Sequence, residues 1–297
     1  MSAKLTLGPL FFNWAPEKQR DFYFRIADEA CIDSVCIGEV VCSKRTPFFE
    51  PYIAEVIERL EAAGKEVVHS TPALIMTERE MAAVRDIAAC DEFFVEANDI
   101  AVCALLGGRR HAIGPFINIY NEDTLEYLTK GGAQRICLPP ELPAASLAVL
   151  AKAAAAELEV MVFGRLPLAV SARCYHARAH NLTKDNCRYV CGEDADGMEI
   201  DTLDGAPFLA VNGTQTLSYA YCNLAGRMAE MREMGINRFR LSPHDVDMAT
   251  VAQIFRNVLD GRESSADAGS RLKELMENAL FCDGYFHNRE GASSGAD

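Results

Sequence analysis

The sequence predicts an α/β protein, a (β/α)8 TIM-like barrel with a cysteine-bearing insertion after the seventh strand. Three observations predict this fold: short apolar runs alternate with amphipathic helical stretches, eight such runs occur, and one segment interrupts the alternation. Eight strands that are each followed by a helix close into a barrel whose active site lies at the carboxyl ends of the strands. An open doubly wound sheet is the alternative, but no GxGxxG motif follows the first strand and no Walker loop occurs.

Strands are expected where β-branched and apolar residues gather, at residues 5–10, 34–38, 66–70, 93–96, 112–119, 135–138, 159–163 and 238–241. Amphipathic stretches predict helices at 16–29, 51–63, 78–89, 123–130, 144–157, 224–234 and 248–259, with a weaker one at 99–108. Helix ends are marked by their chemistry. Asn121 is an expected N-cap followed by the first-turn carboxylates Glu122 and Asp123, and Gly64 is an expected C-cap.

One domain is expected over residues 1–261, because barrels of about 200 to 400 residues form as a single unit. Within it, residues 170–222 should contain a single helix but hold a cysteine segment, the acidic turn "GEDADGMEIDTLDG" and the apolar "PFLAVNGTQTLS". We interpret residues 170–222 as an insertion at the catalytic rim with its own hairpin. Residues 262–297 are rich in Ser, Asp and Glu and are expected to form a peripheral C-terminal tail with a short helix near 271–280.

The charge balance argues against nucleic acid as a partner. The chain has 29 Lys and Arg against 43 Asp and Glu, a formal net charge of −14, which repels a phosphate backbone. No apolar run approaches the roughly 20 residues that span a bilayer, and the start lacks the pattern of a signal peptide. We therefore expect a cytoplasmic protein without a transmembrane segment, whose 11 cysteines are ligands or buried thiols rather than disulfides.

Three cysteines gather in "SARCYHARAHNLTKDNCRYVC", residues 171–191. Cys174, Cys187 and Cys191 are spaced C-x12-C-x3-C in a polar segment that offers little apolar burial. Cys42 in "IGEVVCSKR" follows the second predicted strand, so it is expected at the same barrel rim. Four thiolates suit either tetrahedral zinc or an iron–sulfur cluster, and the scattered spacing favours the cluster. Ordinary burial is the alternative for these thiols, and it is the expectation for Cys31, Cys36, Cys90, Cys103, Cys137, Cys222 and Cys282.

Two histidines lie within the same segment. His176 and His180 have the spacing of ligands in a Cys/His zinc site if the segment is helical. In a second interpretation they act with Arg173 and Arg178 and place positive charge beside a thiolate cluster or an anionic substrate. A solvated face is the third interpretation.

No nucleophile elbow, HExxH motif or Ser/His/Asp pattern occurs, so no hydrolase is predicted. Glu39 at the end of the second strand and His244 at the end of the eighth are rim residues with side chains suited to acid–base work. The sequence does not assign a catalytic residue.

Five segments occur in a fixed order, "GEVVCSKR", "LPLAVSARCYHARAH", "KDNCRYVC", "VNGTQTLS" and "RLSP". Over about residues 4–260 they resemble the UbiV-like proteins of the collagenase-like peptidase (U32-type) superfamily. The resemblance implies a 4Fe–4S cluster held by Cys42, Cys174, Cys187 and Cys191, and a heterodimer with a homologous UbiU-like subunit. It also implies oxygen-independent hydroxylation in anaerobic ubiquinone biosynthesis, no peptidase site, and a lipid-carrier accessory protein that presents the quinone precursor.

The sequence departs from that family at two positions, since Arg165 and Val170 replace the His and Tyr of "HLPLAYSARC". By the same resemblance, prephenate is the expected oxygen donor, and rim arginines such as Arg45 and Arg173 are expected to hold a dicarboxylate. Two alternatives stay open. One is a non-catalytic scaffold stiffened by a cluster or by zinc, and the other is an RNA-hydroxylating relative of the same superfamily.

Overall fold

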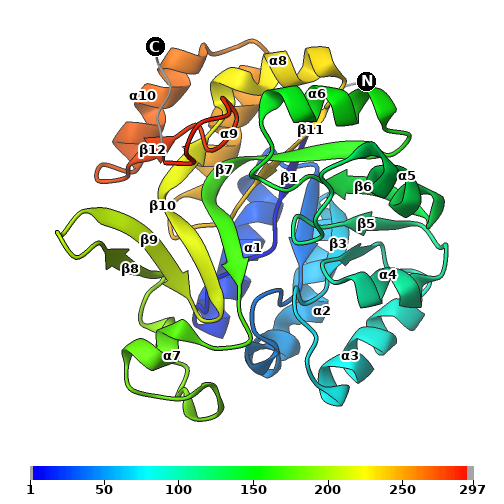
Figure 1. Cartoon of the computed structure of the whole chain (residues 1–297), viewed down its shortest axis with the longest axis vertical. Helices are drawn as coiled ribbons and strands as arrows, with labels where there is room; N and C mark the ends of the chain where they lie inside the picture. Colours follow the sequence, from blue (N-terminus) through cyan, green and yellow to red (C-terminus); the bar gives the residue numbers. More distant parts are fainter. Residues whose placement is uncertain (1–2, 293–297) are drawn as a thin grey trace.

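A closed barrel of eight parallel strands forms the centre of the protein (Figure 1). The computed structural model describes residues 3–292. The barrel strands are β1 (Lys4–Leu7), β2 (Ser34–Ile37), β3 (Glu66–Ser70), β4 (Val95–Ala97), β5 (His111–Ile113), β6 (Ala133–Cys137), β7 (Glu157–Val170) and β11 (Arg238–Leu241). Strand β11 pairs in parallel with both β7 and β1 and so closes the circle. The predicted TIM-like barrel is confirmed, and the open sheet is excluded.

The outer helices follow the expected amphipathic stretches. They are α1 (Pro16–Glu29), α2 (Thr46–Ala62), α3 (Glu78–Ala89), α4 (Ile100–Leu106), α5 (Glu122–Lys130), α6 (Ala144–Ala153), α8 (Met228–Met234) and α9 (Met248–Leu259). Asn121 caps α5, because its Oδ1 accepts from the backbone N–H of Thr124 at 2.8 Å. Helix α3 has a capping box in which Thr77 and Glu80 each accept from the backbone N–H of the other.

Several boundaries differ from the expected ones for local reasons. Helix α2 begins at Thr46 rather than at residue 51, because Pro51 is accommodated inside the helix. Strand β5 ends at Ile113 rather than at residue 119, because the chain turns at Gly114, where a Cβ atom would lie 1.8 Å from Asn98 Oδ1. Helix α6 ends at Ala153, and Glu157 already pairs with β6.

Strand β7 extends well past the barrel and carries a side sheet (Figure 1). The side sheet continues through β10 (Gln215–Asn223), β9 (Pro207–Asn212) and β8 (Met198–Asp201), all antiparallel to their neighbours. The expected strand at 159–163 is therefore too short. Gly164 and Pro167 look like strand breakers in the sequence, but β10 pairs with this stretch through register shifts, where a missing N–H and an unusual φ are tolerated.

Of the three apolar clusters among residues 3–292, the two with the most residues position the site. The larger core lies between the barrel and its helices, and the smaller one joins the loops after β1 and β2 to the side sheet through Leu10, Phe11, Phe12, Trp14, Val40, Val41, Ala210 and Leu217. Because the smaller core joins two loops at one barrel end to the side sheet, it fixes the position of the rim to which the candidate cysteines belong.

The C-terminal residues pack onto the barrel. Helix α10 (Ser265–Leu275) begins earlier than the helix expected near 271–280, and it buries Ala268 and Leu272 in the larger core. Strand β12 (Phe281–Cys282) pairs with β10, and the carbonyl of Phe286 accepts from the N–H of Ala144 at 2.9 Å. Residues 293–297 of the expected tail, and residues 1 and 2 of the expected barrel domain, lie outside the described residues.

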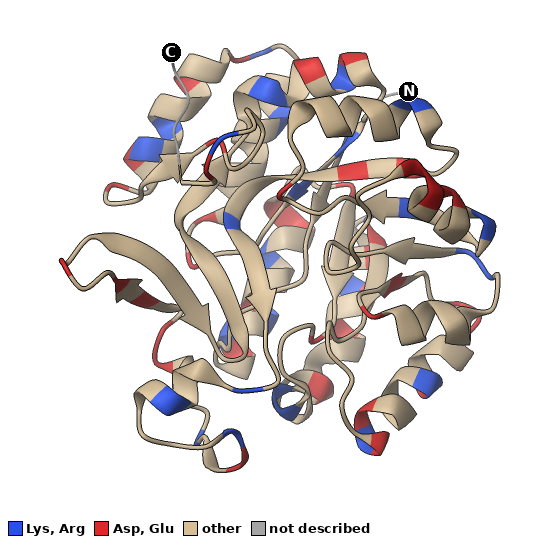
Figure 2. Cartoon of the chain, viewed as in Figure 1, with Lys and Arg blue, Asp and Glu red and all other residues tan. Residues whose placement is uncertain are grey.

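Charged residues of both signs are scattered over the outer helices, and others lie on the barrel strands themselves (Figure 2). No helix among residues 3–292 combines the length and the apolar character needed to cross a bilayer.

Candidate functional site

The four candidate cysteines lie in loops at the carboxyl ends of two barrel strands. Cys42 follows β2, directly before a short 3₁₀ turn. The other three follow β7: Cys174 begins the short helix α7 (Tyr175–Ala179), and Cys187 and Cys191 flank or occupy two 3₁₀ turns. Cys174 and Cys191 are buried, Cys42 and Cys187 are half-buried, and all four are free thiols. We refer to these residues as the four-cysteine group.

Arg45 lies among these thiols. Its guanidinium is close enough to Cys42, Cys174 and Cys191 to affect their charge, and Cys174 is similarly close to Cys187 and Cys191. Residues about 130 positions apart in the chain are thus neighbours in space. This juxtaposition is the one that the two loops were expected to produce at a common rim.

Arg45 makes structural contacts at the rim and also borders a small cavity of about 40 Å³ together with Glu39, and its expected role with a dicarboxylate stays a prediction. Its side chain is only 4% exposed. Nη1 donates to the carbonyl of Phe11 at 2.7 Å, and Nη2 donates to Asn212 Oδ1 at 3.0 Å. The guanidinium therefore fastens the loop after β2 to the loop after β1 and to the side sheet. Arg173, the other arginine considered, is exposed.

Glu39 shapes the backbone around Cys42. One carboxylate oxygen, Oε1, accepts from the N–H groups of Val41 and Cys42, both at 2.8 Å. Burial raises the pKa of Glu39 above its usual value, while Arg45 and these two N–H groups oppose the shift. Because the carboxylate is occupied by the loop it caps, Glu39 is a structural residue rather than the free acid–base group that its position suggested.

Two N–H donors point at cysteine sulfurs. Asn13 Nδ2 donates to Cys191 Sγ at 3.4 Å, and the backbone N–H of Ala177 donates to Cys174 Sγ at 3.3 Å. Such donors stabilise negative charge on sulfur, as they do around iron–sulfur clusters. Burial raises the pKa of the free thiols of Cys42 and Cys174, so these thiols are protonated at neutral pH and release protons when they bind a metal.

The spacing of the sulfurs bears on which group they suit. In a tetrahedral zinc site with Zn–S bonds of about 2.3 Å, the sulfurs lie about 3.8 Å apart. Among the described residues, no three of the four sulfurs lie within 4.8 Å of one another. The four free thiols are therefore not arranged as a preformed tetrahedral zinc site.

His176 and His180 lie on a helix, as the zinc hypothesis required, but their partner is a carboxylate and not a cysteine. Nε2 of His176 lies 2.9 Å from Asp194 Oδ2, and the two imidazole rings stack with centroids 5.6 Å apart. His176 is fully buried and His180 is exposed, so a solvated face describes only the second. Sequence reasoning missed Asp194, whose one signal is its position three residues after Cys191.

His244 is also committed to structure. Its Nε2 accepts from the backbone N–H of Arg165 at 3.0 Å, so Nδ1 donates to Asp196 Oδ1 at 3.1 Å. Burial acts to raise the pKa of Asp196, but the interaction with His244 is stronger in total, and the net effect lowers the pKa of Asp196. The side chain is 1% exposed and makes ring contacts with Phe12 and Tyr221. With both nitrogens engaged, His244 is not a free acid–base group.

Arg165, which departs from the family pattern, binds the side sheet together. Its Nη1 donates to the carbonyl of Ser218 at 3.2 Å, and Nη2 forms an ion pair with Glu199 at 3.0 Å. The guanidinium also lies over the rings of Tyr219 and Tyr221. A cavity of about 280 Å³ borders this arginine and is otherwise lined by residues that include Asp196 and Asp245.

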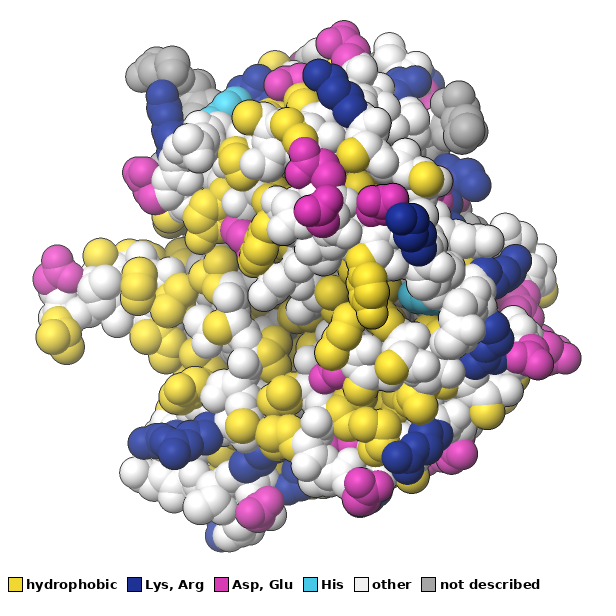
Figure 3. Space-filling model, turned by 45° about the vertical axis from the view of Figure 1, so that its right-hand side comes forward, with side chains coloured by type: hydrophobic (Ala, Val, Ile, Leu, Met, Phe, Trp, Pro, Cys, Tyr) yellow, Lys and Arg dark blue, Asp and Glu magenta, His cyan; other side chains and the backbone are white. Residues whose placement is uncertain are grey.

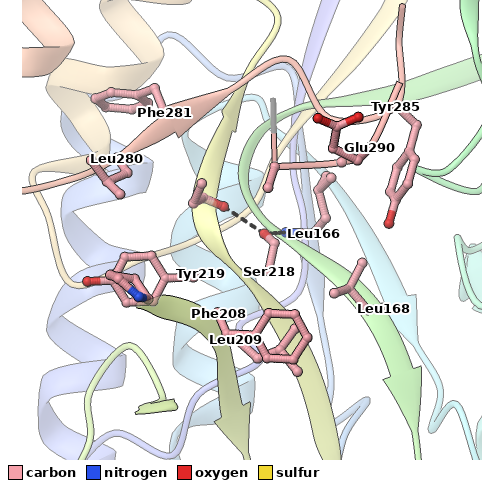
Figure 4. Close-up of a pocket in the computed structure, with 14 residues that line it drawn as sticks. Leu166, Leu168, Phe208, Leu209, Ser218, Tyr219, Leu280, Phe281, Tyr285 and Glu290 are labelled. Carbon is pink, nitrogen blue, oxygen red and sulfur yellow. Dashed lines mark hydrogen bonds between the residues drawn. The ribbon is translucent and has the colours of Figure 1, made fainter. Parts of the chain in front are cut away.

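An apolar cavity of about 550 Å³ lies between the side sheet and the C-terminal residues (Figure 4). Leu166 and Leu168 of β7, Phe208 of β9 and Leu280 before β12 line it, and Ser218 accepts from the N–H of Leu166 within it. Phe208 is 57% exposed and Leu280 is 55% exposed. Hydrophobic side chains also cover the projecting β8–β9 hairpin and the hollowed face beside it (Figure 3).

The barrel interior is charged, which sequence reasoning did not predict. Arg240 of β11 forms ion pairs with Glu159 of β7, at 2.9 Å, and with Glu96 of β4. The sequence does contain one indication of this charged interior, because charged residues occur inside the short predicted strands. The nearby Cys36 and Cys137 are buried, as are Cys222 and Cys282, which confirms their expected burial, whereas Cys31, Cys90 and Cys103 are only half-buried.

Comparison with known proteins gives one match over most of the chain. The model of the family described as "Peptidase family U32" matches residues 22–295. The match includes most of the C-terminal segment, whereas the sequence resemblance extended only to about residue 260.

Solved structures give weaker similarities. The U32 peptidase Mk0906 is 12% identical with a TM-score of 0.45, over 82% of this chain and 94% of that chain. A tryptophan synthase complex from Pyrococcus furiosus is 12% identical with a TM-score of 0.31, over 93% of this chain and 100% of that chain. A phospho-2-dehydro-3-deoxyheptonate aldolase from Thermotoga maritima is 9% identical with a TM-score of 0.33, over 94% of this chain and 71% of that chain.

Proposed function

Because the chain belongs to peptidase family U32, we propose that it is a UbiV-like, iron–sulfur subunit of a heterodimeric, oxygen-independent hydroxylase in anaerobic ubiquinone biosynthesis. One observation carries the proposal. Cys42, Cys174 and Cys191 gather around the buried Arg45, Cys187 lies near Cys174, and N–H donors are directed at two of the sulfurs. Four thiols placed in this way have little to do in a peptidase, but they are the ligand set of a 4Fe–4S cluster.

In this proposal Cys42, Cys174, Cys187 and Cys191 hold the cluster, which supplies one-electron redox chemistry when it is bound. Arg45 balances the negative charge of the thiolates and keeps the loop after β2 against the side sheet. Asn13 and the backbone of Ala177 donate to two of the sulfurs and favour the more reduced, more negative state. The smaller core excludes water from one side of the four-cysteine group.

The apolar cavity supports a prenylated substrate. Its volume of about 550 Å³ and its lining of Leu and Phe side chains fit an isoprenoid chain or an aromatic ring. The exposed apolar side chains beside it, such as Phe208, suit the face of a homologous UbiU-like subunit or a lipid-carrier protein that delivers the substrate.

The experiment begins with anaerobic purification of the chain, alone and with a candidate partner. We expect about four iron and four sulfide per chain. Cys42→Ala, Cys174→Ala, Cys187→Ala and Cys191→Ala should each lose most of the iron, whereas Cys90→Ala, which changes a half-buried thiol at the end of α3, should retain it. Zinc without sulfide, or full iron content in Cys187→Ala, would overturn the cluster assignment.

Ubiquinone made without oxygen then tests the hydroxylase role. We expect the cysteine variants to abolish it and Cys90→Ala to leave it unchanged. A variant that loses the cluster but keeps both the partner complex and the anaerobic quinone would instead support a scaffold. Salt-sensitive binding of RNA by the complex would favour the RNA-hydroxylating alternative.

A further inference from the structure

Three metal-ligating side chains meet beside the four-cysteine group without belonging to it. His176, His180 and Asp194 place one ligand atom each within 4.8 Å of the other two. His176 and His180 come from α7 and its C-terminal end, and Asp194 comes from the loop after Cys191. We call these three residues the His/His/Asp group. The proposed hydroxylase leaves it without a role.

The contact between His176 and Asp194 has the distance of a hydrogen bond but not its geometry. Nε2 lies 2.9 Å from Oδ2, and yet neither ring nitrogen of His176 has a hydrogen-bond partner of acceptable direction among the described residues. The side chain is 0% exposed, so bulk solvent does not reach either nitrogen. A buried polar group without a hydrogen-bond partner is costly, which favours a ligand at this position.

The same distance is natural for two ligands of one metal ion. Ions such as zinc and ferrous iron bind imidazole nitrogen and carboxylate oxygen at about 2.0 to 2.2 Å, so two ligands of one ion lie about 2.9 Å apart at a right angle and about 3.4 Å apart at a tetrahedral angle. The lone pairs of two such ligands point at the ion and not at each other. This arrangement agrees with the short distance between His176 and Asp194 without a well-directed hydrogen bond. The ring planes of His176 and His180 are 10° apart, so the two imidazoles lie side by side.

We propose that His176, His180 and Asp194 bind one divalent transition-metal ion, at a site separate from the four cysteines. Two imidazoles and one carboxylate suit zinc and ferrous iron and leave positions for water. His176 follows Cys174 by two residues, and Asp194 follows Cys191 by three. The ion therefore joins the two ends of the cysteine segment and stabilises the conformation that brings its thiols together.

The test uses the full chain, loaded with its cluster under anaerobic conditions and freed of loosely bound metal by a chelator. Zinc is then added, and bound zinc is measured after desalting and by calorimetry. We expect one zinc per chain in addition to the cluster iron, with a rise in the melting temperature. His180→Ala changes an exposed side chain, so it should fold normally and bind zinc at least tenfold more weakly. Asp194→Asn should behave in the same way.

His287→Ala is the matched control. His287 lies 3.3 Å from Asp283 in a similar His–Asp pair, but within residues 3–292 no third ligand atom completes a group there. This variant should bind zinc like the unchanged chain. The inference is overturned if the unchanged chain binds no additional zinc, or if His180→Ala binds it equally well.

Cobalt separates this site from the cysteines. In the full chain without its cluster, Co²⁺ at the His/His/Asp group should give only weak visible bands, which His180→Ala removes. Strong near-ultraviolet thiolate bands that disappear in Cys187→Ala report cobalt on the cysteines. If these bands account for all of the bound cobalt, and His180→Ala changes neither the weak bands nor the amount of cobalt bound, the inference is overturned. This inference rests on the proposed function only for the cluster-loaded state of the chain. Because the zinc measurement does not depend on hydroxylation, a failure of the hydroxylase proposal can be told apart from a failure of the His/His/Asp site.

Discussion

Asn13 donates a hydrogen bond from its side-chain amide to the sulfur of Cys191 across 3.4 Å and 178 positions of sequence. The loop after β1 thereby contacts the last cysteine of the segment after β7. Gly192 permits this approach, because a Cβ atom there would lie 3.2 Å from the same amide nitrogen. The first and seventh βα loops are therefore coupled at a sulfur atom.

Asn13→Ala should lower the reduction potential of the proposed cluster. The amide hydrogen bond stabilises the more negative, reduced state, and a net hydrogen-bond contribution of about 0.5 to 1.5 kcal/mol corresponds to about 20 to 60 mV for one electron. A redox titration followed by electron paramagnetic resonance measures the shift. Asn118→Ala, at an exposed position in the loop after β5, should leave the potential unchanged. An equal potential in Asn13→Ala would contradict the role of this contact.

Arg45→Met should destabilise the rim and release iron. The change removes the buried donors to Phe11 and Asn212 and leaves Glu39 without its cation, and breaking such a buried ion pair costs about 3 to 5 kcal/mol. Urea unfolding of the cluster-free chain measures the stability, and iron content measures retention. Arg85→Ala removes an exposed ion pair with Glu78 and should change stability by no more than about 0.5 kcal/mol. Normal stability in Arg45→Met would refute this account.

Protonation of Glu159 should reduce the stability of the fold at low pH. Burial alone would raise the pKa of Glu159, but Arg240 and neighbouring arginines outweigh it and lower the pKa to about 2. Because the folded-state pKa lies below the unfolded value of about 4.3, the stabilisation is complete above that value and is lost as pH falls toward about 2.

Urea unfolding of Glu159→Gln between pH 5 and pH 2 checks this expectation. The variant should be less stable at neutral pH, because Arg240 then retains only Glu96, and its stability should fall less steeply with acid. Glu78→Gln, whose side chain is 91% exposed, serves as the control with an unchanged acid slope. A slope in Glu159→Gln as steep as that of the unchanged chain would count against the assignment.

Gly38→Ala should disrupt the turn that leads to Cys42. Gly38 has a φ of +141°, and a Cβ atom there would lie 2.1 Å from the carbonyl oxygen of Ser70, so two barrel strands would have to separate. We expect a loss of at least about 3 kcal/mol in unfolding free energy, with reduced iron content. Gly64→Ala also has a positive φ but meets nothing within 4 Å, and it should cost only about 1 kcal/mol. Similar losses in both variants would show that strain alone, and not the contact with Ser70, matters.

The sequence was sufficient for elements whose signal is local. Helix α5 begins as expected because Asn121 supplies its cap within one turn, and the eight barrel strands follow from apolar runs between helices. Strand β7 was predicted too short, since Gly164 and Pro167 act as local breakers and only the pairing with β10 makes their conformations acceptable. Local periodicity does not contain that information.

By itself the sequence determined the barrel, the end of it to which Cys42 and the cysteine segment belong, and a net charge that disfavours nucleic acid. Only the tertiary structure decided what the polar side chains do there. It buried Arg45 among the thiols, engaged both nitrogens of His244, and brought Asp194 to His176. The physical reason is that helices and strands follow from contacts within a few residues, whereas burial and pairing of a charge depend on groups that are distant in the chain and meet only after the barrel closes.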